Sequence, residues 1–176
     1  MRTVGRPLDR FTLIDRFAVT ITLMLLPLSV GCRDTPRTEI SMQTTDAQKQ
    51  AVEALRNAYS AFNRGDIAAA VSPFDPQIEW TEPPEFPGGG TYHGQSGVAE
   101  YLTQSRAGWA EGSSEPERLI PAGDRVVVFV HAHIRLKGST EWRDVRLADV
   151  YTFHNGKAVS MRAFADREKA LRWVGM

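Results

Sequence analysis

The sequence is poor in cysteine and has no excess of charge of either sign. A single cysteine among 176 residues excludes an intrachain disulfide and a cysteine-cluster zinc site. Because 21 Lys and Arg balance 21 Asp and Glu, the composition indicates no basic surface for phosphates, and we expect no nucleic-acid partner. The length and a hydrophobic share of 42% are typical of one globular domain with short appendages.

The N-terminal apolar run is shorter than the roughly 20 residues that a spanning helix needs. Four arginines precede this uncharged run, Phe17–Gly31, and Pro27 interrupts it. A basic segment followed by a short apolar run is typical of a secretory signal peptide. The run leads into Leu28–Cys32, which resembles a bacterial lipobox, although Ser29 differs from the aliphatic residue usual there. The sequence thus predicts a lipoprotein signal peptide over residues 1–31 and lipidation of Cys32.

Resemblance to a lipobox implies export to the cell envelope, with the chain held at a membrane only through lipid on Cys32. A mis-assigned start, or an ordinary signal peptide with an incidental cysteine, is the alternative. Arg33 follows the cysteine where an inner-membrane retention signal would have Asp, so the leaflet stays open. Residues 32–46 are polar and predict a tether. Removing residues 1–31 takes away four Arg and two Asp, which leaves 17 basic and 19 acidic residues.

The remaining domain, residues 47–176, combines helical and strand patterns. Capping residues and apolar spacing predict helices from Thr45 or Asp46 to about Arg64, over Ile67–Val71, from a Ser96 cap to about Gly108, and from an Asp166 cap to Trp173. Alternation predicts strands over Ile78–Glu82, Glu117–Ile120, Arg125–Lys137, Glu141–His154 and Lys157–Phe164. Glu82–Gly94 is rich in Pro and Gly and predicts a loop, and Asn155-Gly156 predicts a type I′ hairpin. The expected class is α+β, with helices on one face of a mainly antiparallel sheet.

Strand periodicity singles out one carboxylate. The even positions of Arg125–Lys137 are apolar and face the core, whereas His131 and His133 share the opposite face. In the next strand the inward row contains Asp149 among apolar residues. Burial would raise the pKa of Asp149, so that it donates a hydrogen bond or acts as a base near neutrality. A structural carboxylate bonded to a tyrosine or an amide is the open alternative. Glu82 is a second carboxylate near the same enclosure.

Several short segments, in this order and spacing, resemble the NTF2-like superfamily, in particular its SnoaL-like and ketosteroid-isomerase-like branch. They are Ala58–Asp66, Tyr92–Val98, Ala148–Lys157, Ser160–Phe164 and Asp166–Leu171, and the likeness extends over about Asp46–Met176. The resemblance implies a cone, in which a strongly bent antiparallel sheet wraps around N-terminal helices and encloses a pocket. It also implies a homodimer.

The resemblance carries over only part of the isomerase's catalytic set. Asp149 matches its protonated oxyanion-hole aspartate. The general base would fall at Trp80, and the catalytic tyrosine at Ala58, which places Tyr59 on a different helix face. Steroid isomerisation by that set is therefore not expected.

Further candidates surround the expected pocket. Aromatic and apolar side chains that could line it, or simply form core, are Trp80, Tyr92, Tyr101, Tyr151, Met161 and Phe164. The spacing of His131 and His133 permits metal ligation, but no third ligand stands at a matching spacing, so a polar outer face or dimer surface is preferred and no metal is expected. No cofactor is expected either.

Three functions follow. The first is a membrane-tethered domain that binds a small hydrophobic molecule in its pocket. The second is a cofactor-independent isomerase or polyketide-cyclase-like enzyme with Asp149 as acid or base, assisted by Glu82 or His131. The third is a dimeric interaction scaffold. A second titratable group within reach of Asp149 would favour the enzyme over the binding domain.

Overall fold

The computed structural model describes residues 44–176. The predicted signal peptide, the lipidation of Cys32 and most of the predicted tether therefore lie outside the described residues. Within the described part of the chain, no helix is both long enough and apolar enough to cross a membrane.

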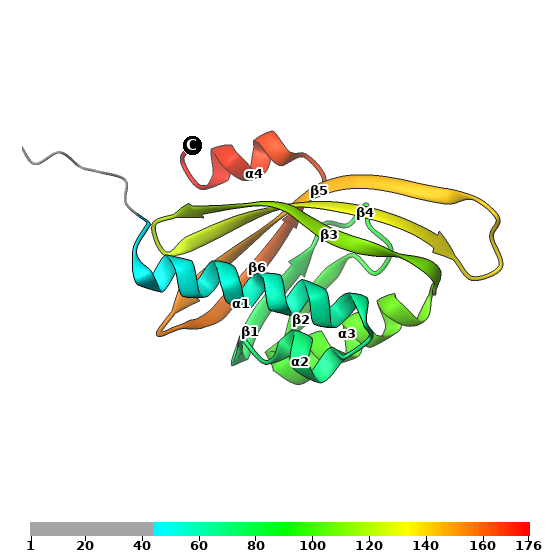
Figure 1. Ribbon diagram of the computed structural model, residues 1–176, viewed down its shortest axis with the longest axis horizontal. Helices are drawn as coiled ribbons and strands as arrows, with labels where there is room; N and C mark the ends of the chain where they lie inside the picture. Colours follow the sequence, from blue (N-terminus) through cyan, green and yellow to red (C-terminus); the bar gives the residue numbers. More distant parts are fainter. Residues whose placement is uncertain (1–43) are drawn as a thin grey trace, which may run out of the picture. The chain divides into compact units, whose positions relative to one another are not determined.

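Six strands form one curved, unclosed sheet in the order β2-β1-β6-β5-β4-β3 (Figure 1). Adjacent strands are antiparallel except for β1 and β6, which run parallel. The strands are β1 Phe74–Glu82, β2 Gly90–His93, β3 Trp109–Ala122, β4 Arg125–Leu136, β5 Trp142–His154 and β6 Lys157–Phe164.

Four helices cover the two faces of the sheet unequally. They are α1 Asp46–Asn63, α2 Ile67–Val71, α3 Gly94–Ala107 and α4 Arg167–Trp173. The first three lie within the curve of the sheet and α4 lies on the outer face (Figure 1). The α+β class, with a bent sheet over the N-terminal helices, is confirmed. The expectation that all helices lie on one face is wrong, because Ala170 of α4 packs on Val127 and Val150 on the opposite face.

Helix α1 begins at the capping residue that the sequence predicts. The Thr45 hydroxyl accepts from the Gln48 N–H at 3.2 Å, and the Gln48 side chain accepts from the Thr45 N–H at 2.9 Å. This reciprocal capping box satisfies two backbone donors at the start of the helix. Ala51, Leu55 and Tyr59, spaced four residues apart, are buried on one stripe, so α1 presents Tyr59 to the inside of the curve.

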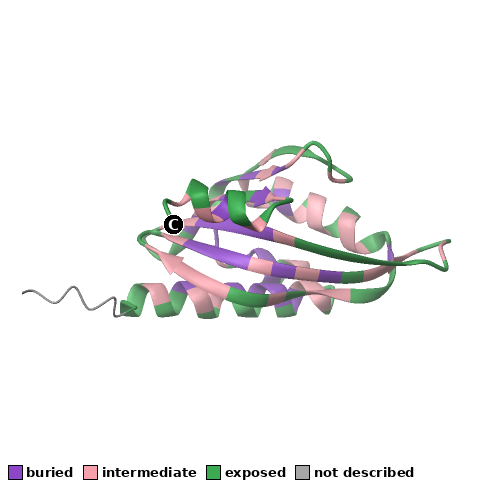
Figure 2. Ribbon diagram, turned by 90° about the horizontal axis from the view of Figure 1, so that it is seen from above, coloured by how far each residue is buried: buried purple, intermediate pink, exposed green. Residues whose placement is uncertain are grey.

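Strands β4 and β5 are buried on both faces at one end only. Val126 and Val128 of β4 face the helices inside the curve. Val127 of β4 and Val150 of β5 point the other way and pack under Ala170 of α4. Figure 2 shows the buried residues concentrated in the middle of the molecule. Further along β4 the outer face has no such cover, and its side chains there are partly or fully exposed.

Four expected boundaries are wrong. Strand β1 begins at Phe74, four residues before the expected Ile78. The Pro/Gly segment Glu82–Gly94 contains a strand, β2, because Gly90–His93 pairs with β1 despite its glycine. The N-cap of helix α3 is His93, three residues before the expected cap at Ser96, and the helix begins at Gly94. Strand β3 extends back from Glu117 to Trp109, because pairing with β4 rather than apolar alternation orders this edge strand.

Gly112 explains how this edge strand runs so close to its neighbour. Its φ is +113°, and a Cβ there would lie 2.1 Å from the carbonyl oxygen of His133. Only glycine allows this approach. The hairpin between β5 and β6 agrees with the prediction, since Asn155 and Gly156 both have positive φ, at 49° and 76°.

Candidate functional site

A cavity of about 160 Å³ lies between the inner face of the sheet and helices α1, α2 and α3. Apolar and aromatic side chains dominate its wall, and two carboxyl groups interrupt them. The lining residues are Ala58, Tyr59, Phe62, Ala70, Phe74, Trp80, Glu82, Phe86, Tyr101, Leu102, Ser105, Trp109, Ser114, Val130, Ala132, Leu147, Asp149 and Tyr151.

The first polar cluster of the cavity joins β5 to α1. Asp149 is 8% exposed, and its side chain points inward because it follows the parity of the buried row of β5. The Tyr59 hydroxyl donates to Oδ2 of Asp149, and the Tyr151 hydroxyl donates to the Tyr59 oxygen at 3.4 Å. The cluster therefore orients two hydroxyls and one carboxyl within an apolar wall.

The second polar cluster lies on β1. Glu82 is also 8% exposed, and the indole N–H of Trp80 donates to its Oε1 at 2.8 Å. Both residues share one strand face because they are two positions apart. Tyr101 of α3 completes the cluster, since its hydroxyl interacts with the Glu82 carboxylate.

Burial shifts the acidity of both carboxyl groups in the same direction. It raises the pKa of Asp149 to about 8, with a further rise from the charge of Glu82 that the Tyr59 hydrogen bond partly opposes. Burial also raises the pKa of Glu82, and donation from Trp80 and Tyr101 counteracts that rise. Asp149 is consequently mostly protonated at pH 7. The cavity thus contains a neutral carboxylic acid, Asp149, and a second titratable group, Glu82, whose charge affects the pKa of Asp149.

The structure separates the predicted pocket residues into two groups. Trp80, Tyr101 and Tyr151 line the cavity with the two carboxyl groups. Tyr92, Met161 and Phe164 do not line it: Tyr92 stacks behind Tyr101 at 4.3 Å between ring centroids, Met161 is fully buried in the core, and Phe164 packs against Trp173 of α4 at 5.8 Å on the outer face.

Two expectations about catalytic groups are wrong. Tyr59 does not face away from the pocket: it lies on the buried stripe of α1 with Ala51 and Leu55, and its hydroxyl contacts Asp149. Its place in the buried stripe of the first helix was the signal that could have found it. His131 cannot assist Asp149, since it projects from the opposite face of the sheet and binds Asp144 instead.

Sequence and structure comparisons now identify the class of this domain. Residues 55–161, more than half of the chain, match the model of the SnoaL-like domain. The chain belongs to the SnoaL-like family, within the NTF2-like fold that the curved sheet and helices define. No curated protein matches the chain in sequence.

Solved structures agree on the fold. An NTF2-like protein of unknown function from Burkholderia pseudomallei is 25% identical, with a TM-score of 0.60 over 72% of this chain and 98% of its own. TerC, co-crystallised with polyporic acid, is 27% identical, with a TM-score of 0.58 over 72% of this chain and 99% of its own. A protein from Catenulispora acidiphila with a ketosteroid isomerase-like fold, in complex with trimethylamine, is 16% identical, with a TM-score of 0.57 over 65% of this chain and 83% of its own. This last likeness concerns the fold alone.

Proposed function

We propose that this domain binds a small, mainly apolar molecule in the cavity and holds the oxygen of that molecule at the Asp149 cluster. The observation that carries the proposal is the placement of the Asp149 carboxyl, whose pKa is raised by burial, beside two tyrosine hydroxyls in a mainly apolar wall. Ligand sites commonly combine an apolar lining with a few convergent polar groups. The co-crystal of the related TerC with polyporic acid supports the view that such domains take small organic molecules.

The cavity has room for about one ring. An apolar cavity of about 150 Å³ holds one benzene molecule. The cavity here, about 160 Å³, therefore suits a single-ring compound or a short acyl chain rather than a steroid.

The charges of the cavity limit the ligand further. A neutral Asp149 can donate to a carbonyl or hydroxyl oxygen, as Tyr59 can after rotating its hydroxyl. Burial and the charge of Glu82, which together raise the pKa of Asp149, would disfavour a carboxylate on the ligand in the same way. We infer that the ligand is uncharged and carries a carbonyl or phenolic oxygen.

Titration calorimetry with four one-ring probes tests this function at pH 7. We expect acetophenone and phenol to bind, benzene to bind more weakly, and benzoate to bind more than about tenfold more weakly than phenol. Ala132→Phe fills the cavity and should abolish binding, while Ala110→Phe, on an exposed position of β3, should not. Circular dichroism checks that both variants fold. If none of the probes binds at millimolar concentration, or if Ala132→Phe binds like the wild type, the pocket is not a ligand site.

A second function, proton transfer, is favoured by one specific observation: Glu82 provides the second titratable group near Asp149. In this scheme, Glu82 removes a proton from the carbon beside a carbonyl, Asp149 and Tyr59 stabilise the enolate oxygen, and the proton then returns to carbon. Two carboxyl groups whose pKa values are shifted by their surroundings commonly divide the roles of acid and base.

Deuterium exchange separates the enzyme from the binding domain. In D₂O, the methyl protons of acetophenone should be replaced by deuterium faster when the protein is present than in buffer alone. Glu82→Gln should abolish this acceleration, and Asp149→Leu should lower it by about 10²-fold or more. If acetophenone binds but never exchanges, the proton-transfer function is wrong and the binding function stands.

We also propose that lipid on Cys32 holds the domain at the cell envelope. The support is the arrangement of the N-terminal sequence, with its basic segment, short apolar run and lone cysteine. Radiolabelled palmitate should label the wild-type chain expressed in bacteria, and Cys32→Ser should remove the label and release the protein from the membrane fraction. An unlabelled wild-type chain would contradict the anchor.

A further inference from the structure

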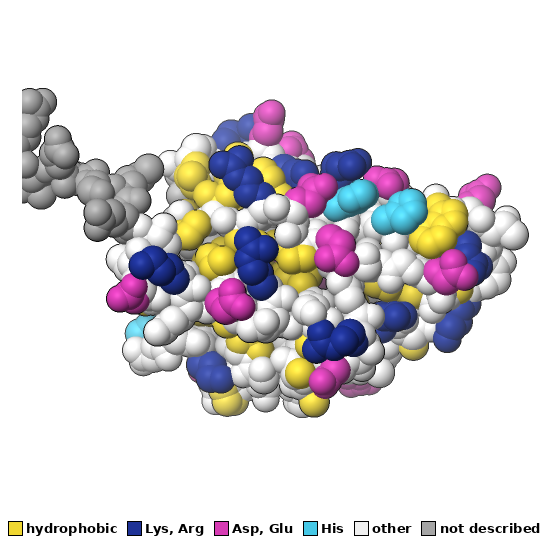
Figure 3. Space-filling view, viewed as in Figure 1, with side chains coloured by type: hydrophobic (Ala, Val, Ile, Leu, Met, Phe, Trp, Pro, Cys, Tyr) yellow, Lys and Arg dark blue, Asp and Glu magenta, His cyan; other side chains and the backbone are white. Residues whose placement is uncertain are grey.

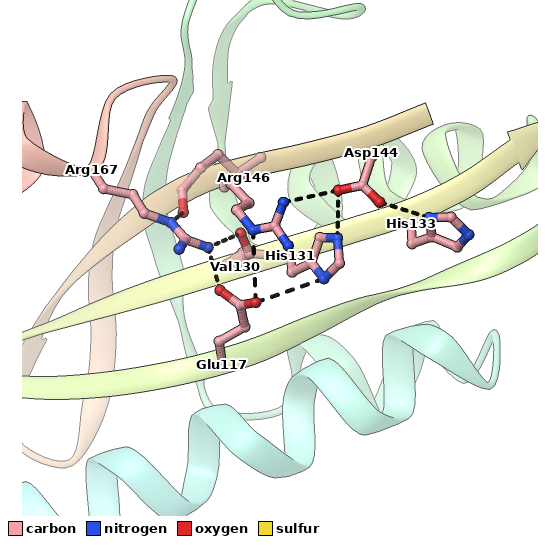
Figure 4. A network of polar contacts seen from close by, with 8 residues as sticks. Glu117, Val130, His131, His133, Asp144, Arg146 and Arg167 are labelled. Carbon is pink, nitrogen blue, oxygen red and sulfur yellow. Dashed lines mark hydrogen bonds and ion pairs between the residues drawn. The ribbon is translucent and has the colours of Figure 1, made fainter. Parts of the chain in front are cut away.

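The outer face of the sheet holds a cluster that the pocket does not use. His131 and His133 project from this face of β4, and Asp144 of β5 lies directly across from His133 in the register. Nε2 of His131 is 2.8 Å from Oδ1 of Asp144, and Nδ1 of His133 is 2.9 Å from Oδ2 (Figure 4). One carboxylate therefore accepts a hydrogen bond from each imidazole.

We propose that His131, His133 and Asp144 bind one divalent transition-metal ion, with Zn²⁺ as the representative. Two imidazole nitrogens with one carboxylate oxygen form a donor set suited to zinc, copper or nickel, and unlike the all-oxygen sets of magnesium or calcium. The argument against a metal from sequence was the lack of a third ligand near the two histidines. Strand pairing supplies that ligand from β5.

The geometry needs little adjustment to hold an ion. One ligand atom from each of the three residues lies within 4.8 Å of the others. In a tetrahedral site with bonds of about 2.1 Å, ligand atoms are about 3.4 Å apart. The two nitrogens already point at the same carboxylate, so an ion would replace the two shared protons with only small side-chain rotations.

Neighbouring side chains orient the two imidazoles. Oε1 of Glu117, on β3, is 3.7 Å from Nδ1 of His131, on the side of the ring away from Asp144. Arg167 fixes Glu117 at 2.7 Å. A carboxylate that accepts from the second nitrogen of a ligating histidine fixes its tautomer and ring orientation, and Glu117 would do so after moving a few tenths of an ångström closer. The ring of His133 stacks on Trp142, with centroids 4.5 Å apart and planes 8° apart.

Arg146 opposes a cation at this cluster. Its guanidinium is 3.1 Å from Oδ1 of Asp144 and 4.0 Å from Glu117. It is more than half exposed, so it can turn away from Asp144 toward Glu117 or solvent. Figure 3 shows histidines at the surface next to both acidic and basic side chains. Arg146 therefore weakens the site without blocking it, and its removal should tighten metal binding.

The metal cluster and the ligand pocket are independent of each other. His131, His133 and Asp144 project from the face of β4 and β5 opposite to Val130, Leu147 and Asp149, which line the cavity. A metal ion could be bound whether or not the pocket binds a ligand, so metal binding can be tested without any activity.

Titration calorimetry with ZnCl₂ on the full-length chain in detergent tests the proposal. We expect one ion per chain, and a loss of affinity of more than about 100-fold in each of His131→Ala, His133→Ala and Asp144→Asn. His154→Ala, also on β5 but outside the cluster, is the matched control and should bind like the wild type. Arg146→Ala should bind about two- to fivefold more tightly.

Opposite outcomes would overturn the site. They are no binding by the wild type, unchanged binding in the two histidine variants, or half an ion per chain, which would place the ion between two copies. Asp144→Asn changes only one exposed group, so it keeps the test decisive if a histidine variant fails to fold. Quenching of tryptophan fluorescence by Cu²⁺ is an independent readout, because Trp142 stacks on His133. The part of the fluorescence that Cu²⁺ quenches should be missing in Trp142→Phe.

Discussion

Asp149 and Asp144 lie five residues apart on one strand, yet the two faces of the sheet treat them in opposite ways. Asp149 faces inward, where burial and the charge of Glu82 raise its pKa to about 8. Asp144 faces outward, where hydrogen bonds from His133 and His131 lower its pKa. Because alternate residues of β5 face opposite sides of the sheet, Asp149 is a neutral hydrogen-bond donor and Asp144 is a charged acceptor.

The comparison shows that surroundings decide the role of a carboxyl group more than sequence neighbourhood does. The inner face offers hydroxyls and apolar walls but no cation among the cavity-lining residues. The outer face offers two imidazoles and the guanidinium of Arg146. We therefore expect the same substitution, Asp to Asn, to have opposite effects at the two positions.

The largest effect is expected from Asp149→Asn. Between the unfolded pKa of about 3.9 and the folded pKa of about 8, only the folded state keeps the proton, so stability falls as pH rises across this window. Asparagine is neutral at every pH and avoids this loss. Urea unfolding should show Asp149→Asn more stable than the wild type by up to about 4 kcal/mol at pH 7, and nearly equal at pH 4. A pH-independent difference would contradict the raised pKa.

Tyr59→Phe should have an intermediate effect that identifies the partner of Asp149. It removes the hydroxyl that donates to Asp149 and accepts from Tyr151, leaving buried polar groups unpaired. We expect a loss of about 1–3 kcal/mol in the free energy of unfolding. Tyr92→Phe is the matched control, since the Tyr92 hydroxyl bonds Gly88 at the exposed loop. Equal losses in the two variants would show that the hydrogen bonds of the buried Tyr59 stabilise the protein no more than the exposed one of Tyr92.

Asp144→Asn should have the smallest effect on stability, and it should destabilise the protein, whereas Asp149→Asn stabilises it. The stabilisation that Asp144 provides is present above the unfolded pKa of about 3.9 and is lost as pH falls through its lower folded pKa. Because the side chain is half exposed, water and salt screen its interactions. We expect a slight loss of stability at pH 7 that 1 M NaCl removes. A gain at pH 7, like that of Asp149→Asn, would remove the contrast between the faces.

Local patterns were sufficient to predict much of this molecule. Strand alternation placed Asp149 in the buried row, and capping residues placed the start of the first helix. These features depend on residues within a few positions of one another. The SnoaL-like family and its cone fold were predicted differently, from the resemblance of several short segments, taken in order, to a known family.

What could not be predicted depends on register and on packing angles. Asp144 meets His133 only through the pairing of β4 with β5, which spacing along the chain does not show. Tyr59 contacts Asp149, 90 positions away, through the packing of α1 on the sheet, which an ungapped alignment cannot give. Phe164 was expected inside, but it lies next to α4, a helix whose docking face the sequence did not reveal.

The parallel pairing of β1 with β6 also determines when the pocket can form during synthesis. Within the described chain, β1 pairs only with β2 and β6, and Trp80 lies beside Met161, 81 positions later. Contacts so distant in sequence form late and slowly. Glu82 therefore leaves the ribosome long before the strand that brings it next to Asp149. The two parts of the sheet that carry the carboxyl groups are joined only after β6 has been made, so we expect a chain that stops before Lys157 to contain both carboxyl groups without the closed cavity.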